Sequence, residues 1–250
     1  MPMSTDNENL AAWFQTPLGG YLLDREQHYC DRMVADVFGF NAFQFGLPEY
    51  DFLRASRIAL RCVVGRDGKA GLRADFRDLP IASNSADLVL LPHVLEFHVD
   101  PHQILREVQR IMMPEGQMII TGFNPWSLWG IPRLRKSARR HYPWCGQFIN
   151  LSRLKDWLAL LGFEIVAGRM CCYAPPFKQE KWLRRFAFME KAGDRWWPVG
   201  GGVYFFQAVK RVRGMRVITP QWHERFAAKK NLSAIPQKAA QKEPITMKRP

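Results

Sequence analysis

Apolar and polar positions between residues 86 and 123 follow one another as a strand, a helix and a second strand. The run ADLVLLPH, from Ala86, is nearly all apolar, which is typical of a strand inside a parallel sheet. Asp100 and Pro101 then suit the N-cap and first position of a helix. Its apolar positions recur on one face: Ile104, Leu105, Val108, Ile111 and Met112. After a PEGQ turn, the strand QMIITGF completes a predicted βαβ unit with a right-handed crossover.

The flanking segments extend this pattern on both sides. Strands are predicted at 41–47, 57–64 and 72–76 before the unit, and at 163–168 and 203–212 after it. A leucine-rich helix from Leu151 should end at Gly162, and the chain should begin with two helices separated by a TPLGG break. Residues 173–202 are too long for a hairpin loop, so we expect an insertion with a helix around Trp182 to Met189. Together these elements predict an α/β fold with a mostly parallel sheet and helices on both faces.

Composition adds a second region to this picture. The 250 residues suit one large domain, expected at 1–212 with N-terminal helices at 1–37, followed by a basic and largely disordered tail at 213–250. That tail holds nine Lys or Arg and two Glu, out of a net charge of +13. A second basic cluster, RLRKSARR, contains no acid. Such clusters attract phosphates, nucleic acid or anionic lipid, and a solvated basic surface is the alternative.

Several classes of protein are not expected from the sequence. The five cysteines form no CxxC pair and no clustered set with histidine, which predicts reduced thiols and no metal site. No run of 18 apolar residues suggests a membrane span, and the segment MPMSTDNENL lacks the features of a secretory signal. We therefore expect a cytoplasmic protein.

The residues around the βαβ unit resemble a known family. The steps are D-x-x-x-LP at Asp75, S-x-D-L-V-L at Ser85, H-V-L-E at His93 and R-x-M-x-P-E-G at Arg110. In this order and spacing they resemble the class I S-adenosylmethionine (SAM) methyltransferases, of the bacterial type-11 group. The resemblance implies a Rossmann-like fold with a seven-stranded sheet and SAM over the carboxyl ends of its first strands. A ligand crevice at those ends is also expected of open α/β sheets in general.

The resemblance assigns the amino-acid part of SAM to the loop after the first strand. Phe45, Gly46 and Leu47 occupy that place, with Gln44 and Leu47 where the family carries further glycines. Close approach of a ligand favours glycine, so Gly46 would be the single glycine in the cofactor's path, or would serve only a turn. Asp67 stands where the family holds both ribose hydroxyls, although an Asp-Gly pair also suits a tight turn.

The next two strand ends are assigned to the rest of the cofactor. Asp75 and Phe76 match the positions that recognise adenine, where a carboxylate accepts from the exocyclic amine. The alternative for Asp75 is a helix or turn cap. The segment Leu91, Pro92 and His93 would face the ammonium or sulfonium group.

The substrate side follows the fourth and fifth strands. His93 suits a general base, because its ordinary pKa lies near operating pH, or it only lines the pocket. Glu96, Asn124 and Trp126 are the expected acceptor-binding residues, with tryptophan packing as the alternative. The expected function is transfer of a methyl group from SAM to an unidentified acceptor. The basic clusters allow an anionic acceptor, including RNA, but no stacking motif or RNA-binding module supports a nucleic acid. The rivals are a non-catalytic protein of the same fold and a nucleic-acid-binding protein that uses the basic tail.

Overall fold

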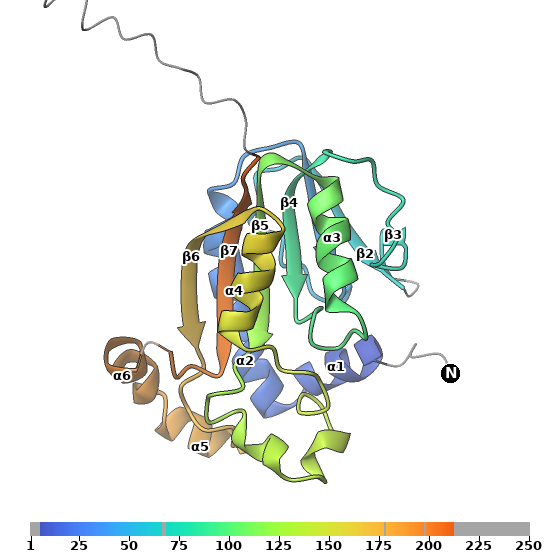
Figure 1. The fold of residues 1–250 in the computed structure, drawn as a ribbon. Helices are drawn as coiled ribbons and strands as arrows, with labels where there is room; N and C mark the ends of the chain where they lie inside the picture. The colour runs from blue at the N-terminus through green and yellow to red at the C-terminus, as the bar shows by residue number, and fades with distance from the viewer. Residues whose placement is uncertain (1–5, 67–68, 178, 198, 213–250) are drawn as a thin grey trace, which may run out of the picture. The chain divides into compact units, whose positions relative to one another are not determined.

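The computed structural model describes residues 6–66, 69–177, 179–197 and 199–212, all of which belong to one compact unit. The predicted basic tail at 213–250 lies outside the described residues. One seven-stranded sheet runs through the unit in the order β3-β2-β1-β4-β5-β7-β6 (Figure 1). The strands are β1 (Asn41–Phe45), β2 (Leu60–Gly65), β3 (Leu72–Arg73), β4 (Ala86–Pro92), β5 (Met112–Phe123), β6 (Phe163–Cys171) and β7 (Val203–Lys210). The helices are α1 (Asp6–Phe14), α2 (Pro17–Ala35), α3 (Pro101–Ile111), α4 (Leu151–Leu160), α5 (Glu180–Arg185) and α6 (Phe188–Trp196), with short 3-10 turns η1 (Ile131–Leu134) and η2 (Ala138–Arg140).

The sheet confirms the predicted fold class. β1, β2, β3, β4 and β5 pair in parallel, whereas β7 pairs antiparallel with both β5 and β6. Strand order reverses between β1 and β4, which is the switch point where this class of sheet opens a crevice. The carboxyl ends of β1, β2 and β4 therefore meet at one edge of the sheet.

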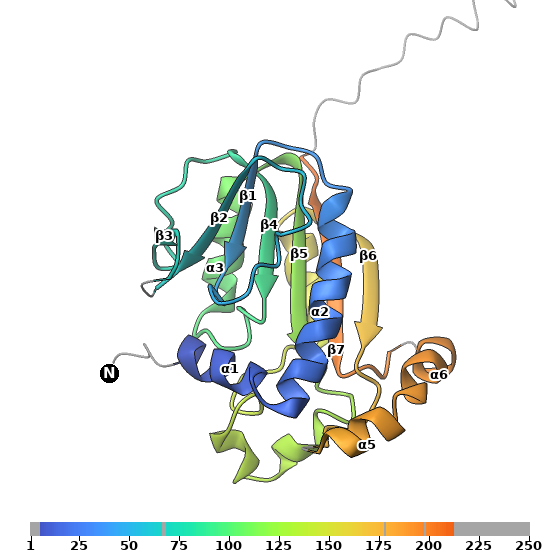
Figure 2. The same cartoon turned by 180° about the vertical axis from the view of Figure 1, so that it is seen from behind.

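Helices cover the two faces of the sheet unequally. α3 and α4 lie on one face (Figure 1) and α2 lies on the other (Figure 2). Each face has its own buried apolar cluster. The connections at 46–59 and 74–85, within the described chain, form turns and no helix. On the second face, the buried apolar cluster contains Leu22 of α2 together with Leu90 and Phe205 of the sheet. The N-terminal helices therefore cover the apolar surface of that face.

The first two helices meet more sharply than the TPLGG break predicted. α2 begins at Pro17, with the Thr16 hydroxyl accepting the Gly19 N–H at 3.1 Å as its N-cap. Both glycines therefore lie inside the first turns of the helix. A Cβ on Gly19 would stand 2.2 Å from the Trp13 carbonyl oxygen, so the tight corner between α1 and α2 requires glycine.

Two further boundaries differ from the prediction. β5 begins at Met112 directly after α3, and the PEGQ turn becomes an irregularity within the strand, with Glu115 at a φ of 64°. The insertion holds two helices, α5 and α6, in place of one. Within the described part of the chain, no helix is both long and apolar enough to cross a membrane.

Candidate functional site

The loop after β1 is a compact turn built around one buried amide. Gly46 and Leu47 have φ angles of 74° and 49°, and the Gly46 N–H donates to Val64 at 2.8 Å. The Gln44 side chain donates to the carbonyl oxygen of Tyr50 at 2.8 Å and accepts the Phe52 N–H at 2.9 Å. It also contacts the carbonyl oxygens of Gly46 and Leu47, both at 3.2 Å. The residue that stands in place of a family glycine therefore fixes the shape of the loop.

The ends of β2 and β3 bring together a carboxylate and two arginines. Asp75 Oδ2 lies 2.7 Å from Arg77 Nη2 and 3.1 Å from Arg66 Nη2. Hydrogen bonds from Arg77, with the nearby charge of Arg66, hold the pKa of Asp75 well below its usual range. An amine that donates a hydrogen bond to Asp75 would have to compete with these two guanidinium groups. Asp67, the predicted ribose ligand, lies outside the described residues.

Phe76, the neighbour of Asp75, points into the core rather than toward a ligand. It is 1% exposed and packs edge-on against Phe45 at 5.5 Å and His98 at 5.1 Å between ring centroids. Phe45 is itself fully buried. Their side chains support the strand ends and are not available to a ligand.

His93 lies between two carboxylates at the end of β4. Its Nε2 is 2.5 Å from Glu26 Oε1 on α2, and its Nδ1 is 2.8 Å from Glu96 Oε2. All three side chains are buried, and the ring stacks on Phe123 at 4.3 Å. Burial alone would lower the pKa of His93, but Glu26 and Glu96 outweigh it and raise the pKa to about 10. We call these three residues the Glu–His–Glu cluster.

This geometry does not provide the general base that the sequence suggested. Both ring nitrogens of His93 face carboxylates, and the ring is already protonated at neutral pH. Burial raises the pKa of the other partner, Glu96, and the two carboxyl groups contact the ring from opposite sides. Glu26 Oε2 is buried and has no hydrogen-bond partner among the described residues. A buried hydrogen-bond acceptor without a donor is rare in proteins. This oxygen could therefore accept a hydrogen bond from a ligand or bind a cationic group.

Glu26 was missed by the sequence analysis although a signal was present. It lies in the buried stripe of α2, spaced by four residues from Leu22 and Cys30. A charged residue inside an apolar stripe is seldom buried without a partner. The partner is far away in the sequence, so the pattern alone could flag Glu26 but could not identify His93.

The three predicted substrate residues separate in the structure. Glu96 is buried, and its Oε1 accepts the Phe123 N–H. Asn124 is also buried and donates to the carbonyl oxygens of Val199 and Gly201 at 2.9 and 3.0 Å. These two side chains hold the backbone around the site. Trp126 is 78% exposed and is the only one of the three that faces outward.

Three strand ends at this edge lead into residues with positive φ. Leu47 follows β1, His93 follows β4 with a φ of 52°, and Cys172 follows β6 with a φ of 60°. Non-glycine residues in this conformation cost energy and gather at functional sites. Leu91 and Pro92 are buried just before His93. Leu47 and His93 thus follow the two strands that flank the switch point, while Asn84 and Glu115 have positive φ at the opposite end of the sheet.

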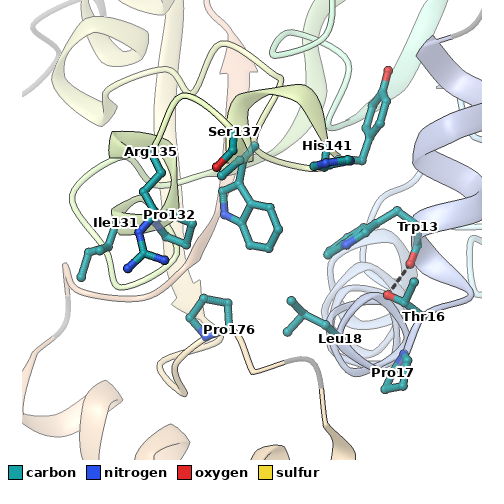
Figure 3. A pocket seen from close by; sticks show the side chains of 13 residues that line it. Trp13, Thr16, Pro17, Leu18, Ile131, Pro132, Arg135, Ser137, His141 and Pro176 are labelled. Atoms are coloured by element: carbon teal, nitrogen blue, oxygen red, sulfur yellow. Dashed lines mark hydrogen bonds between the residues drawn. The ribbon is translucent and has the colours of Figure 1, made fainter.

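A cavity of about 880 Å³ lies between the α1–α2 corner and residues 131–144. Figure 3 shows Arg135 and Ser137 across the cavity from Trp13, Thr16 and Leu18. Its walls are mostly apolar, and Arg135 and His141 supply the polar groups that can carry positive charge. A volume of this size suits a small-molecule ligand. None of these residues was singled out as a ligand from the sequence, because two distant segments build the cavity.

Two aromatic rings in series, Trp13 and Phe123, separate the cavity from the Glu–His–Glu cluster. Trp13 lines the cavity and packs edge-on against Phe123 at 6.1 Å. Phe123 in turn stacks on His93. Among the described residues, no group of three or more His, Cys, Asp or Glu side chains is placed to hold a metal ion. The arrangement offers an apolar ligand cavity beside a buried cluster of two carboxyl groups and a histidine.

Comparisons with known proteins identify similar sequences. Residues 54–120 match the family model described as "Methyltransferase domain", type 11. The chain is 30% identical over 156 residues to the uncharacterized protein YafS of Escherichia coli K12, and the match covers 62% of this chain and 65% of YafS. It is 28% identical over 110 residues to a malonyl-[acyl-carrier protein] O-methyltransferase of Methylovorus sp. MP688, covering 44% of this chain and 37% of that protein. The chain thus spans less than two thirds of the length of either relative.

A solved structure shows the same fold at lower identity. The SAM-dependent methyltransferase from Archaeoglobus fulgidus superposes with a TM-score of 0.54 at 16% identity, over 75% of this chain and 94% of that one. This likeness concerns the fold, which agrees with the strand order described above. Residues 54–120 are thus similar to the type-11 methyltransferase family, and the chain shares the fold of the class I SAM-dependent methyltransferases.

Proposed function

We propose that this protein binds SAM at the carboxyl ends of β1, β2 and β4 and methylates a small acceptor held in the cavity beside them. The observation that carries the proposal is the Glu–His–Glu cluster at the end of β4, in which Glu26 Oε2 is buried and has no hydrogen-bond partner among the described residues. The cofactor carries a sulfonium and an ammonium group, and both fit an anionic neighbour. When bound, SAM supplies the methyl group as an electrophile.

The chain's own residues then bind, orient and exclude water. The backbone of Gly46 and Leu47 would contact the amino-acid part of SAM, and Leu91 to His93 would pass beside the sulfonium. Asp75 and Phe76 remain the proposed adenine contacts, with Asp67 for the ribose. His93 acts here by holding Glu26 and Glu96 in place rather than by accepting a proton.

A segment that covers the proposed SAM site has to move before the cofactor can bind. Gly46, Leu91, Pro92 and His93 are buried in this structure. α1 lies under the carboxyl ends of β1 and β4 (Figure 2), and its Phe14 packs against Tyr50 at 5.5 Å and His93 at 6.3 Å. We infer that α1 is that cover, so SAM binding should change amide exchange in α1 and leave α4 unchanged.

The cavity favours an acceptor with a carboxylate. Arg135 gives an anionic group a partner, while the aromatic walls hold an apolar body. A carboxylate oxygen attacks a methyl group without losing a proton, so no general base is needed. One relative in the same family is named for O-methylation of a malonyl group, which is a carboxylate acceptor.

Calorimetry of the full chain with SAM and with its demethylated product tests the proposal. We expect both to bind at ~1 mM or below. Glu26→Gln should weaken SAM more than the product, by about five- to tenfold, because only SAM carries the sulfonium charge, and that ratio corresponds to roughly 1–1.4 kcal/mol. Asp24→Asn on the exposed side of the same helix is the control. If neither compound binds, the enzyme proposal fails and the non-catalytic alternative takes its place.

The acceptor class has its own assay. Transfer from methyl-labelled SAM to a set of carboxylic acids should give a methyl ester, which releases labelled methanol in base. Arg135→Gln should lower the yield, whereas Arg106→Gln on the exposed side of α3 should not. A base-stable methyl product would show that the acceptor is an amine, a hydroxyl or carbon instead.

A further inference from the structure

Large apolar side chains are exposed around α6 and the segment that begins after β5. They line a groove of about 1020 Å³ whose two walls come from residues 125–134 and 188–200. Seven of them are 55–80% exposed: Trp126, Ile131, Leu134, Phe188, Trp196, Trp197 and Val199. Isolated exposed apolar residues are ordinary, but a continuous patch of this size marks a binding surface. We call it the tryptophan groove.

Positive charge borders the groove on both sides. Arg135, Lys136, Arg139 and Arg140 are exposed beside its first wall, and residues 125–147 contain no acid. On the other side α5 exposes Lys181, Arg184 and Arg185, with Glu180 bound to Arg184 at 2.5 Å. The groove therefore combines indole rings, aliphatic side chains and a surplus of cations.

This combination fits the boundary of a lipid bilayer. Tryptophan prefers the level of the headgroups, where its ring is half apolar and its N–H is solvated. Lysine and arginine near such a surface are attracted to anionic lipids. A nucleic acid would satisfy the cations but would leave the aliphatic side chains of Ile131 and Leu134 in water. We propose that the tryptophan groove docks this protein on a membrane surface rich in anionic phospholipid.

The position of the groove agrees with peripheral docking. α5, α6 and η1 all lie at the carboxyl end of the sheet (Figure 1), on the side of the α1–α2 corner. Ile131 lines both the tryptophan groove and the cavity proposed for the acceptor. A bilayer bound at the groove would therefore lie next to the mouth of that cavity. The docking does not depend on catalysis and can be measured without SAM.

Co-sedimentation of the full chain with vesicles tests the proposal. We expect binding to vesicles of phosphatidylcholine mixed with phosphatidylglycerol and little binding to phosphatidylcholine alone. The double variant Trp196→Ala with Trp197→Ala should lose binding by at least ~10-fold, as burial of two indole rings implies. The variant Lys136→Gln with Arg140→Gln should lose a similar factor and show a weaker dependence on salt.

Two controls separate the groove from other sources of binding. Phe38→Ala with Phe40→Ala removes two aromatic rings that are 74% and 79% exposed ahead of β1 at the opposite end of the sheet, and it should bind like the wild type. Lys229→Gln with Lys230→Gln removes two charges from the basic tail. If the tail variant abolishes binding while the tryptophan variant leaves it unchanged, the groove is not the docking surface. A dimer in sedimentation velocity that the tryptophan variant dissociates would likewise overturn the proposal in favour of self-association.

Discussion

Glu26 on α2 and His93 at the end of β4 meet with 2.5 Å between Oε1 and Nε2, although 67 residues separate them in the chain. The contact joins the N-terminal helices to the carboxyl edge of the sheet. Because Glu96 holds the other nitrogen of the ring, the histidine is fixed in position and in charge. Stability and ligand binding should therefore both respond to the protonation of His93.

Stability should fall as the pH rises above the pKa of a free imidazole. The folded pKa of His93 is about 10, above the ordinary value of 6.5, so the folded state keeps a proton that the unfolded state releases. The contribution is fully present below pH 6.5 and is lost as pH rises through 10. Between pH 7 and 8 we expect the free energy of unfolding to drop by about 1 kcal/mol per pH unit from His93, and the buried thiols add to this slope as the pH nears 8. Urea unfolding measures the slope, and Glu26→Gln should flatten it. If the wild type and Glu26→Gln give the same slope of unfolding free energy against pH, the Glu–His–Glu cluster is not its cause.

A second histidine should act in the opposite direction at lower pH. Burial, with the charge of Arg66, lowers the pKa of His98 to about 4 from 6.5. The unfolded chain therefore binds a proton that the folded state refuses, and stability is lost as pH falls from 6.5 toward 4. Between pH 7 and pH 5, His98→Gln should lose less free energy of unfolding than the wild type does. Identical pH profiles would show that His98 titrates normally.

Asp75 should affect SAM binding despite its arginine partners. Asp75→Ala removes the acceptor proposed for adenine and releases Arg66 and Arg77, so SAM affinity should fall by about 1–3 kcal/mol. Asp78→Ala, an exposed neighbour, should bind SAM normally. The side chain of Asp75 is 36% exposed, which limits its effect on stability. Unchanged affinity in calorimetry would assign adenine to another part of the edge.

Gln44 should matter more for the loop after β1 than its strand position suggests. Gln44→Leu would leave the Phe52 N–H and the Tyr50 carbonyl oxygen without their partner in a buried place. We expect a loss of about 2–4 kcal/mol in the free energy of unfolding, from the desolvation of these groups. Faster amide exchange at Phe52 would locate the effect. Gln27→Leu, which loses one 3.3 Å hydrogen bond on the surface, should cost little.

The cysteines should divide by reactivity. Cys145 is exposed and Cys62 is half-buried, whereas Cys30, Cys171 and Cys172 are buried. Burial raises the pKa of the Cys30 and Cys171 thiols well above their usual range, which suppresses the reactive thiolate. Titration with a chromogenic disulfide at pH 8 should give one fast thiol, which Cys145→Ser removes. The buried thiols should react only after denaturant is added.

The sequence predicted best where the signal was local. The strand at 86–92, the Asp100 N-cap and the end of α4 at Gly162 each rest on neighbouring residues, and the structure confirms all three. The resemblance at Asp75 and at Ser85 to Gly116 implied the fold class and a seven-stranded, mostly parallel sheet, and the structure has both. Those features repeat within a short length of chain, so spacing alone can carry them.

The site was predicted less well because its contacts are distant in sequence. The motif placed His93 at the right edge but could not show that Glu26 occupies its second nitrogen. Asp75 was identified without Arg66, and Asn124 without its carbonyl partners near residue 200. Charge state depends on such partners more than on residue type. A titratable residue in a motif therefore gives a position, and only the fold gives its role.

The order in which the chain is synthesised has a consequence for α2. Leu22, Cys30 and Val34 pack into the apolar cluster that contains Val203 and Phe205, close to the end of the described chain. At ordinary rates of translation, α2 waits roughly 10–40 s after leaving the ribosome before β7 is complete. Leu90 and His93, which also contact this helix or its cluster, are made earlier, so the stripe lacks only the part of its cluster that β7 supplies during this delay. The nascent chain should therefore hold α2 on β4 and β5 before the antiparallel side of the sheet is complete.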